Sequence, residues 1–89
     1  MNKQDVLKAV IDKYGEEAQC RQVMEECAEL IQATNKTIRY PTEPSRQMLI
    51  KEMADVTVML EQLAIMFNIT SGELETAIDD VIKDLSILI

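Results

Sequence analysis

The spacing of apolar residues predicts a chain that is helical almost throughout. Apolar residues recur three and four positions apart in four segments, as on one face of an α-helix, and no strand-like alternation persists. We expect helices over residues 3–14, from about Glu16 to Thr34, over about 44–68, and from the turn "NITSGEL" to about Leu88. The expected fold is all-α, an antiparallel four-helix bundle formed by a single small domain.

Capping and breaking residues support these boundaries. Asn2 can cap the first helix, and Gly15 is placed to end it. The clearest loop is the segment 35–45, where Pro41 and Pro44 interrupt helical backbone. Pro44 also suits the first turn of the helix that follows, because that position needs no backbone N–H.

The turn before the last helix carries a more specific signal. Thr70 and Glu73 have the spacing of a capping box, in which each side chain bonds the backbone N–H of the other residue. Ile69 and Leu74 flank this pair at the positions of a hydrophobic staple. The last helix is therefore expected to begin at this point.

Each predicted helix has an apolar stripe that we expect to face the core. In the first two helices the stripes are Val6, Val10, Ile11 and Tyr14, and then Val23, Cys27, Leu30, Ile31 and Thr34. In the last two they are Leu49, Met53, Val56, Leu60, Leu63 and Phe67, and then Leu74, Ile78, Val81, Leu85 and Leu88.

The third helix has further apolar residues away from its stripe, namely Val58, Ile65 and Met66, and the chain ends in "LSILI". This is more apolar surface than 89 residues can easily cover. We therefore expect a homo-oligomer, without a subunit count from these residues alone.

Composition and charge narrow the possible functions. The chain is 47% hydrophobic with three aromatic residues, so its core is aliphatic, and its net charge is −7. A strongly acidic chain is poorly suited to nucleic acid or to an anionic membrane surface, and no apolar run is long enough to span a bilayer. We expect neither partner.

The titratable residues exclude several kinds of catalysis. There is no histidine, which rules out a histidine general base, a Ser-His-Asp triad and a histidine-containing zinc site. Cys20 and Cys27 lie seven residues apart on one predicted helix, about 10 Å along its axis, which is too far for a disulfide. Two free thiols indicate a reducing compartment, so we expect a cytoplasmic protein. Small buried residues are the simpler interpretation of both cysteines.

Acidic residues three positions apart form two pairs, although the chain has sixteen Asp and Glu. The pairs are Glu26 with Glu29 and Glu52 with Asp55, in the similar segments "ECAEL" and "EMADV". Residues at this spacing share a helix face, so two carboxylates can hold one divalent cation. If the second and third helices form a hairpin, the four carboxylates can converge.

Two interpretations of the carboxylates remain open from spacing alone. They can form a solvated acidic face, or they can bind Mg²⁺ or Mn²⁺, which prefer oxygen ligands. Glu25 adds a further carboxylate one turn from Glu29 and can support the metal or act as a base for water. Gln19 and Gln22 lie toward the carboxylate side of the same helix.

The motif "EECAE" followed by "EMAD" resembles the EExxE…ExxD signature of the all-α nucleoside triphosphate pyrophosphohydrolases, and the chain is most similar to the MazG-like members. The resemblance covers roughly residues 16–85, so it implies one MazG-like domain over residues 1–89. It implies Mg²⁺-dependent hydrolysis of a nucleoside triphosphate to the monophosphate and pyrophosphate. It also implies a homodimer or a dimer of dimers.

The resemblance implies roles for individual residues as well. Glu26, Glu29, Glu52 and Asp55 occupy the positions that bind the metal in that family, and Glu25 would activate water or support the metal. Phosphate contacts are expected near the loop after the first motif, where the candidates are Lys36, Arg39 and Lys51, each of which can also be an ordinary surface charge. Tyr40 can stack on a base or merely anchor the loop.

One departure from the family pattern leaves other functions open. Many MazG-like proteins carry a lysine in the middle of the last helix, whereas here Lys83 is displaced and lies in the acidic segment "AIDDVIKDL". The alternatives are a phosphoribosyl-ATP pyrophosphohydrolase, which shares the signature, and a non-catalytic helical interaction module that retains the fold.

Overall fold

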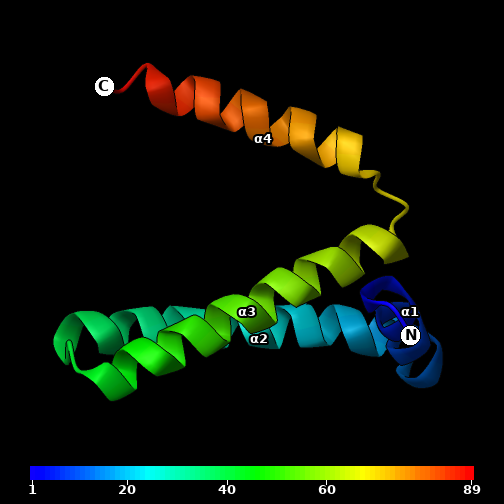
Figure 1. Ribbon diagram of the computed structural model, residues 1–89, viewed down its shortest axis with the longest axis horizontal. Helices are drawn as coiled ribbons and strands as arrows, with labels where there is room; N and C mark the ends of the chain where they lie inside the picture. Colours follow the sequence, from blue (N-terminus) through cyan, green and yellow to red (C-terminus); the bar gives the residue numbers. More distant parts are fainter.

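The computed structural model describes all 89 residues and contains four helices and no strands (Figure 1). They are α1 (Lys3–Tyr14), α2 (Glu16–Arg39), α3 (Glu43–Met66) and α4 (Ser71–Ser86). The two long helices, α2 and α3, run antiparallel as a hairpin, and α1 packs across one end of it (Figure 1). The all-α fold class is confirmed, and α2 continues to Arg39 rather than ending near Thr34.

The expected caps are present at both ends of α1. The Asn2 side chain accepts a hydrogen bond of 2.8 Å from the backbone N–H of Asp5. Gly15 ends the helix with φ of +91°, a backbone conformation that a residue with a Cβ rarely adopts. The chain can therefore turn directly from α1 into α2, with only one residue between the two helices.

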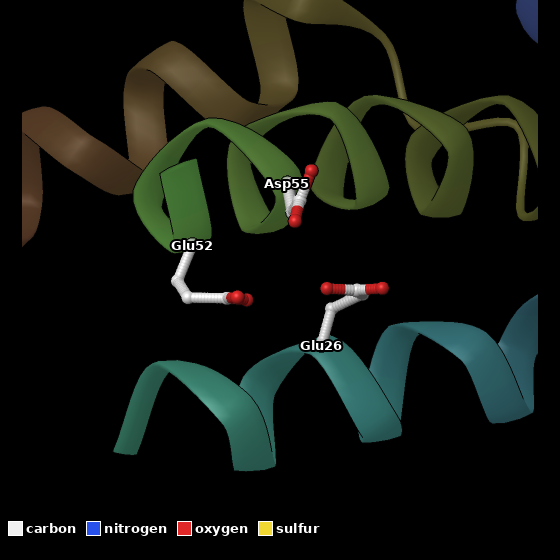
Figure 2. A group of neighbouring side chains, drawn as sticks. All are labelled: Glu26, Glu52 and Asp55. Atoms are coloured by element: carbon white, nitrogen blue, oxygen red, sulfur yellow. The ribbon is translucent and has the colours of Figure 1, made fainter. Parts of the chain in front are cut away.

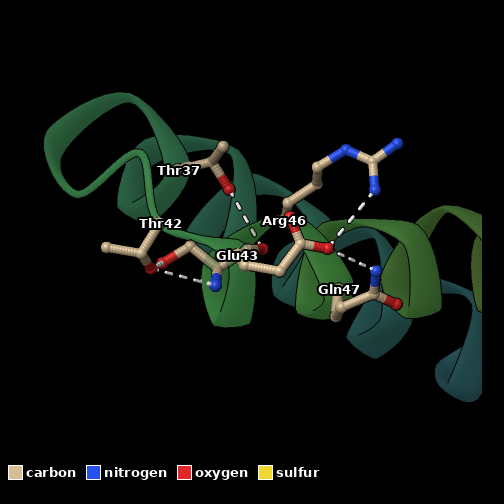
Figure 3. A network of polar contacts seen from close by, with 6 residues as sticks. Thr37, Thr42, Glu43, Arg46 and Gln47 are labelled. Carbon is tan, nitrogen blue, oxygen red and sulfur yellow. Dashed lines mark hydrogen bonds and ion pairs between the residues drawn. The ribbon is translucent and has the colours of Figure 1, made fainter.

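The turn between α2 and α3 is fixed by its own polar side chains (Figure 3). Thr42 caps α3 by accepting a hydrogen bond of 3.3 Å from the Ser45 N–H. The Thr37 hydroxyl, in the last turn of α2, donates to the Ser45 carbonyl at 3.4 Å. On the outer side, the Glu43 carboxylate accepts from Gln47 at 2.8 Å and lies 3.5 Å from Arg46. These contacts set which residues of α2 and α3 lie opposite each other.

The turn between α3 and α4 is also held by hydrogen bonds. Asn68 adopts φ of +55°, and the N–H groups of Asn68 and Ile69 bond to the carbonyls of Ile65 and Ala64, as in a Schellman motif. The predicted capping box is confirmed: Thr70 accepts from the Glu73 N–H at 3.1 Å, and Glu73 accepts from the Thr70 N–H at 2.9 Å. These bonds fix the direction in which α4 leaves α3.

That direction separates α4 from the rest of the chain. The helix extends away from the end of α3 at an open angle and packs against none of the other three helices (Figure 1). All of its residues are exposed. Within one chain, only α1, α2 and α3 pack together, so the expected packing of the fourth helix into the bundle is not made by this chain alone.

The core is correspondingly small. Five apolar residues are buried, namely Leu7, Ile11, Val23, Ala33 and Met66. Much of the expected core is exposed, including Ile31 at 70%, Met53 at 54% and Phe67 at 61%. For α3, the reason is the orientation of the helix, which buries Glu52, Gln62 and Met66. Its apolar stripe is therefore divided: Met53, Leu60 and Phe67 are exposed, whereas Leu49, Val56 and Leu63 are half-buried.

We predict that Thr70→Ala lowers the free energy of unfolding by about 1 kcal/mol, because an N-cap hydroxyl and its capping box are lost. Urea unfolding followed by far-UV circular dichroism measures the change. Thr76→Ala is the matched control on the same helix, and it should be neutral or stabilising because alanine is the better helix former. Equal losses in the two variants would show that the cap does not support α4.

Candidate metal centre

Three carboxylates converge between the two helices of the hairpin (Figure 2). Glu26 extends from α2, and Glu52 and Asp55 extend from α3, so that one oxygen of each lies within 4.8 Å of the others. Figure 2 shows the three side chains pointing toward one another across the space between the helices. The predicted convergence of the two acidic pairs is thus found for three of their four members.

Helical spacing and hairpin register together produce this arrangement. Glu52 and Asp55 are three residues apart and therefore share one face of α3. The polar turn at Thr42 and Ser45 sets the register that brings Glu26 opposite them. A single connection of three residues between α2 and α3 therefore builds the cluster from a contiguous part of the chain.

Two oxygens in the cluster lack a partner. Oε2 of Glu26 and Oε2 of Glu52 are both buried and accept no hydrogen bond, and Glu52 as a whole is only 6% exposed. Buried polar atoms in folded proteins almost always have a partner, and an unpaired buried carboxylate oxygen is especially costly. A cation at this point would satisfy both atoms.

The protein neutralises the cluster only in part. Gln22, one turn before Glu26, donates a hydrogen bond of 2.8 Å to the other oxygen of that residue. The Lys51 ammonium donates to Asp55 at 2.7 Å and lies 3.9 Å from Glu52. When all three carboxylates are ionised, they and the one ammonium have a net charge of −2, which one divalent cation would balance.

The close approach of these charged groups shifts the pKa values of Glu26 and Lys51. Burial raises the pKa of Glu26 above its ordinary value, and the charges of Glu29 and Asp55 raise it further, while the bond from Gln22 opposes them. The hydrogen bond to Asp55 and its charge raise the pKa of Lys51, so this residue stays protonated. The site thus disfavours the ionised form of Glu26 until positive charge is added.

An oxygen-only donor set of this kind fits a hard divalent cation. Mg²⁺ binds through one or two carboxylates and keeps several waters, and Mn²⁺ accepts the same ligands. Glu26, Glu52 and Asp55 supply the carboxylates, and the two unpaired oxygens are free to bind. The residues therefore fit the metal expected from the sequence.

The other two predicted carboxylates lie outside the cluster. Glu29 is exposed, one turn beyond Glu26, yet its charge acts on the pKa of Glu26, so it lies close to the site. Glu25 is exposed and makes no hydrogen bond or ion pair. Its assignment to water activation, like that of Glu29 to the metal, stays a prediction.

The predicted substrate-binding residues divide into two groups. Lys51 lies at the carboxylates, whereas Lys36, Arg39 and Tyr40 lie at the far end of α2, with Lys36 about 15 Å along the helix from Glu26. The Arg39 guanidinium lies 5.6 Å from the centre of the Tyr40 ring, and both residues are exposed. In this chain they are not brought to the cluster.

The sequence did not predict the roles of two glutamines on these helices, the half-buried Gln22 and the buried Gln62. Gln22 positions Glu26, and its spacing of four residues from Glu26 is the signal that indicates this contact. Gln62 of α3 is only 1% exposed, and its carbonyl oxygen has no partner. A polar residue on the buried face of an otherwise apolar helix is the available signal for Gln62.

Comparison with known families gives one match. The model of the MazG nucleotide pyrophosphohydrolase domain matches residues 14–86, which include all of the carboxylates described above. Neither a curated protein nor a solved structure matches the chain. None of the four helices is both long and apolar enough to cross a membrane.

We predict that Glu26→Gln stabilises the metal-free protein at neutral pH. A raised pKa means that the folded chain binds more protons than the unfolded chain above pH 4.5, so stability falls as the pH rises through that window. The amide removes this slope while keeping the bond from Gln22. Urea unfolding in the presence of a chelator, at a series of pH values, measures how the free energy of unfolding depends on pH. An unchanged pH dependence would contradict the assigned cause.

Proposed function

Because the chain belongs to the MazG nucleotide pyrophosphohydrolase domain family, we propose that it hydrolyses a nucleoside triphosphate to the monophosphate and pyrophosphate with the help of Mg²⁺. The observation that supports the metal most directly is the pair of unpaired oxygens on Glu26 and Glu52, buried within a net negative cluster. Mn²⁺ would be accepted by the same oxygens.

The carboxylates would hold the cation. Glu26 and Glu52 offer their unpaired oxygens, Asp55 completes the group, and Glu29 adds negative charge from the exposed side. When bound, Mg²⁺ neutralises charge on the phosphate oxygens and lowers the pKa of a neighbouring water. Gln22 keeps the Glu26 carboxylate oriented while its other oxygen remains available.

Water is the nucleophile in this proposal. The chain has no histidine, and hydrolysis of a phosphoric anhydride needs no covalent intermediate, because catalysis of phosphoryl transfer consists mainly of positioning and electrostatic stabilisation. Glu25 is exposed beside Glu26, and we assign it to orienting the attacking water. Its carboxylate is free of ion pairs and can accept a proton.

Lys51 would interact first with Asp55 and then with the phosphates of the substrate. In the metal-free chain its ammonium neutralises Asp55, and its side chain is 68% exposed, so it can swing outward. A cation that takes over Asp55 would release Lys51 toward the negatively charged phosphates of the substrate. Metal and nucleotide binding would then support each other.

The first test is pyrophosphate release from a panel of ordinary and modified nucleoside triphosphates and phosphoribosyl-ATP, with and without Mg²⁺. We expect Mg²⁺-dependent release from at least one of them. Glu52→Gln should abolish both this activity and the rise in melting temperature with Mg²⁺. Glu25→Gln is the matched control: it should slow hydrolysis and retain the response to Mg²⁺.

The two readouts separate the parts of the proposal. Silence across the panel from folded protein that still responds to Mg²⁺ would overturn the activity and favour a non-catalytic module. An unchanged Mg²⁺ response in Glu52→Gln would overturn the metal assignment. Release from phosphoribosyl-ATP alone would replace the nucleoside triphosphate as the substrate.

A second prediction concerns Lys51→Met. Removing the ammonium should strengthen Mg²⁺ binding several-fold without nucleotide, because Asp55 no longer has a competing cation, and should weaken binding of a non-hydrolysable triphosphate analogue. Isothermal titration calorimetry measures both. Lys36→Met, in which a distant lysine is lost, should leave Mg²⁺ binding unchanged. Weaker binding of Mg²⁺ to Lys51→Met would contradict the competition.

A further inference from the structure

The polar edge of the α2–α3 hairpin continues beyond the carboxylates. On α3, Gln62 lies seven residues after Asp55, which is two helical turns, so the two residues share one edge of the helix. Gln62 is only 1% exposed, the lowest value in the chain, and its carbonyl oxygen has no hydrogen-bond partner. Because buried polar atoms are almost always paired, this oxygen indicates a donor that the chain itself does not supply.

Helix α2 repeats this arrangement in the opposite direction. Gln19 lies seven residues before Glu26 and is 7% exposed. Because α2 and α3 are antiparallel and Glu26 lies close to Asp55, the same register places Gln19 at the level of Gln62. Both glutamines are about 10 Å along the hairpin from the carboxylates, near the end that α1 packs across (Figure 1). One polar edge therefore has the metal ligands and, two turns away, a pair of buried amides.

The packing of the hairpin alone does not account for the amide of Gln62. A methionine has a side chain of similar length without the polar atoms, and the same side of α3 already accommodates Met59, which is half-buried, and Met66, which is buried. An amide in such a position is removed from water without gaining a bond for its oxygen, which costs stability. The oxygen is better explained by a ligand group that donates to it.

A side-chain amide is complementary to the edge of a nucleobase. It has a carbonyl acceptor beside an NH₂ donor, and the pairing edge of each common base has an N–H donor beside an acceptor. Met59 lies between Asp55 and Gln62 along α3, and its thioether can contact an aromatic ring. If its phosphates lie at the carboxylates, a nucleotide that follows this edge brings its base to the two glutamines.

We propose that Gln62, together with Gln19, selects the base of the substrate by hydrogen bonding to its edge. The carbonyl oxygen of Gln62 accepts from an N–H group of the base, and the amide of Gln19 contributes a second pair of polar groups. This inference rests on the proposed function, because the metal centre holds the phosphates. The two glutamines determine specificity and take no part in the chemical step. Since Gln62 is buried in the free chain, the hairpin must open beside α1 to admit the base.

The first experiment measures base selection without turnover. The full chain with Mg²⁺ is titrated in a calorimeter with α,β-methylene triphosphate analogues of the common bases, and with tripolyphosphate, which has no base. We expect one base to bind about tenfold or more tightly than the others. Replacing the edge hydrogen of that base by a methyl group should remove its advantage. A parent chain that binds every base like tripolyphosphate would overturn the proposal.

The variant Gln62→Met removes both polar atoms and keeps the length of the side chain. It should reduce the preference for the best base about tenfold, because the edge N–H loses its acceptor, and leave the affinity for tripolyphosphate unchanged. Its melting temperature should equal or exceed that of the parent, because no unpaired oxygen remains. Gln47→Met, at an exposed glutamine of the same helix, is the matched control and should bind every analogue like the parent.

The possible results separate base selection from hydrolysis. If Gln62→Met keeps the parent's ranking of the bases, a buried water rather than a base pairs with the oxygen, and the proposal is overturned. Equal weakening of every analogue and of tripolyphosphate would show a structural role alone and would also overturn it. A base preference that depends on Gln62 in a chain that releases no pyrophosphate would support the selection and contradict the proposed activity. The methylated base tests the same bond in the parent, so the conclusion does not depend on how the variant folds.

Discussion

The structure depends on three carboxylates that lie between α2 and α3, among the few apolar side chains of that contact. Glu26, Glu52 and Asp55 share the interior of the hairpin, where like charges repel and unpaired oxygens are costly. This repulsion opposes the closure of the hairpin. Its stability therefore depends on added positive charge and on apolar contacts made elsewhere.

The rotation of α3 follows from the same constraint. Because Glu52 and Gln62 are buried, Met53 and Leu60 on another side of the helix remain exposed. Leu60 lines a groove beside α1, which the first turns of α4 also line. The polar interior and the large exposed apolar surface are thus two results of one helix orientation.

Much of this could be predicted from the sequence, because it depends on local interactions. The helices, the Asn2 cap, the capping box at Thr70 and the two acidic pairs all follow from residues within one turn of each other. The sequence could not predict that Glu29 lies outside the cluster or that α4 packs against no other helix of the chain. Periodicity shows that a face is apolar, but it does not show which partner covers it or how a helix is rotated.

The contiguity of the candidate site has a consequence for how the chain can evolve. Gln22, Glu26, Lys51, Glu52 and Asp55 all belong to one hairpin, and the side chains of its own turn fix the register. Neither α1 nor α4 supplies a group to the cluster. Substitutions in these two helices can therefore alter the outer surface while the three carboxylates stay in place, so the hairpin alone is the unit that a metal site at this point would require.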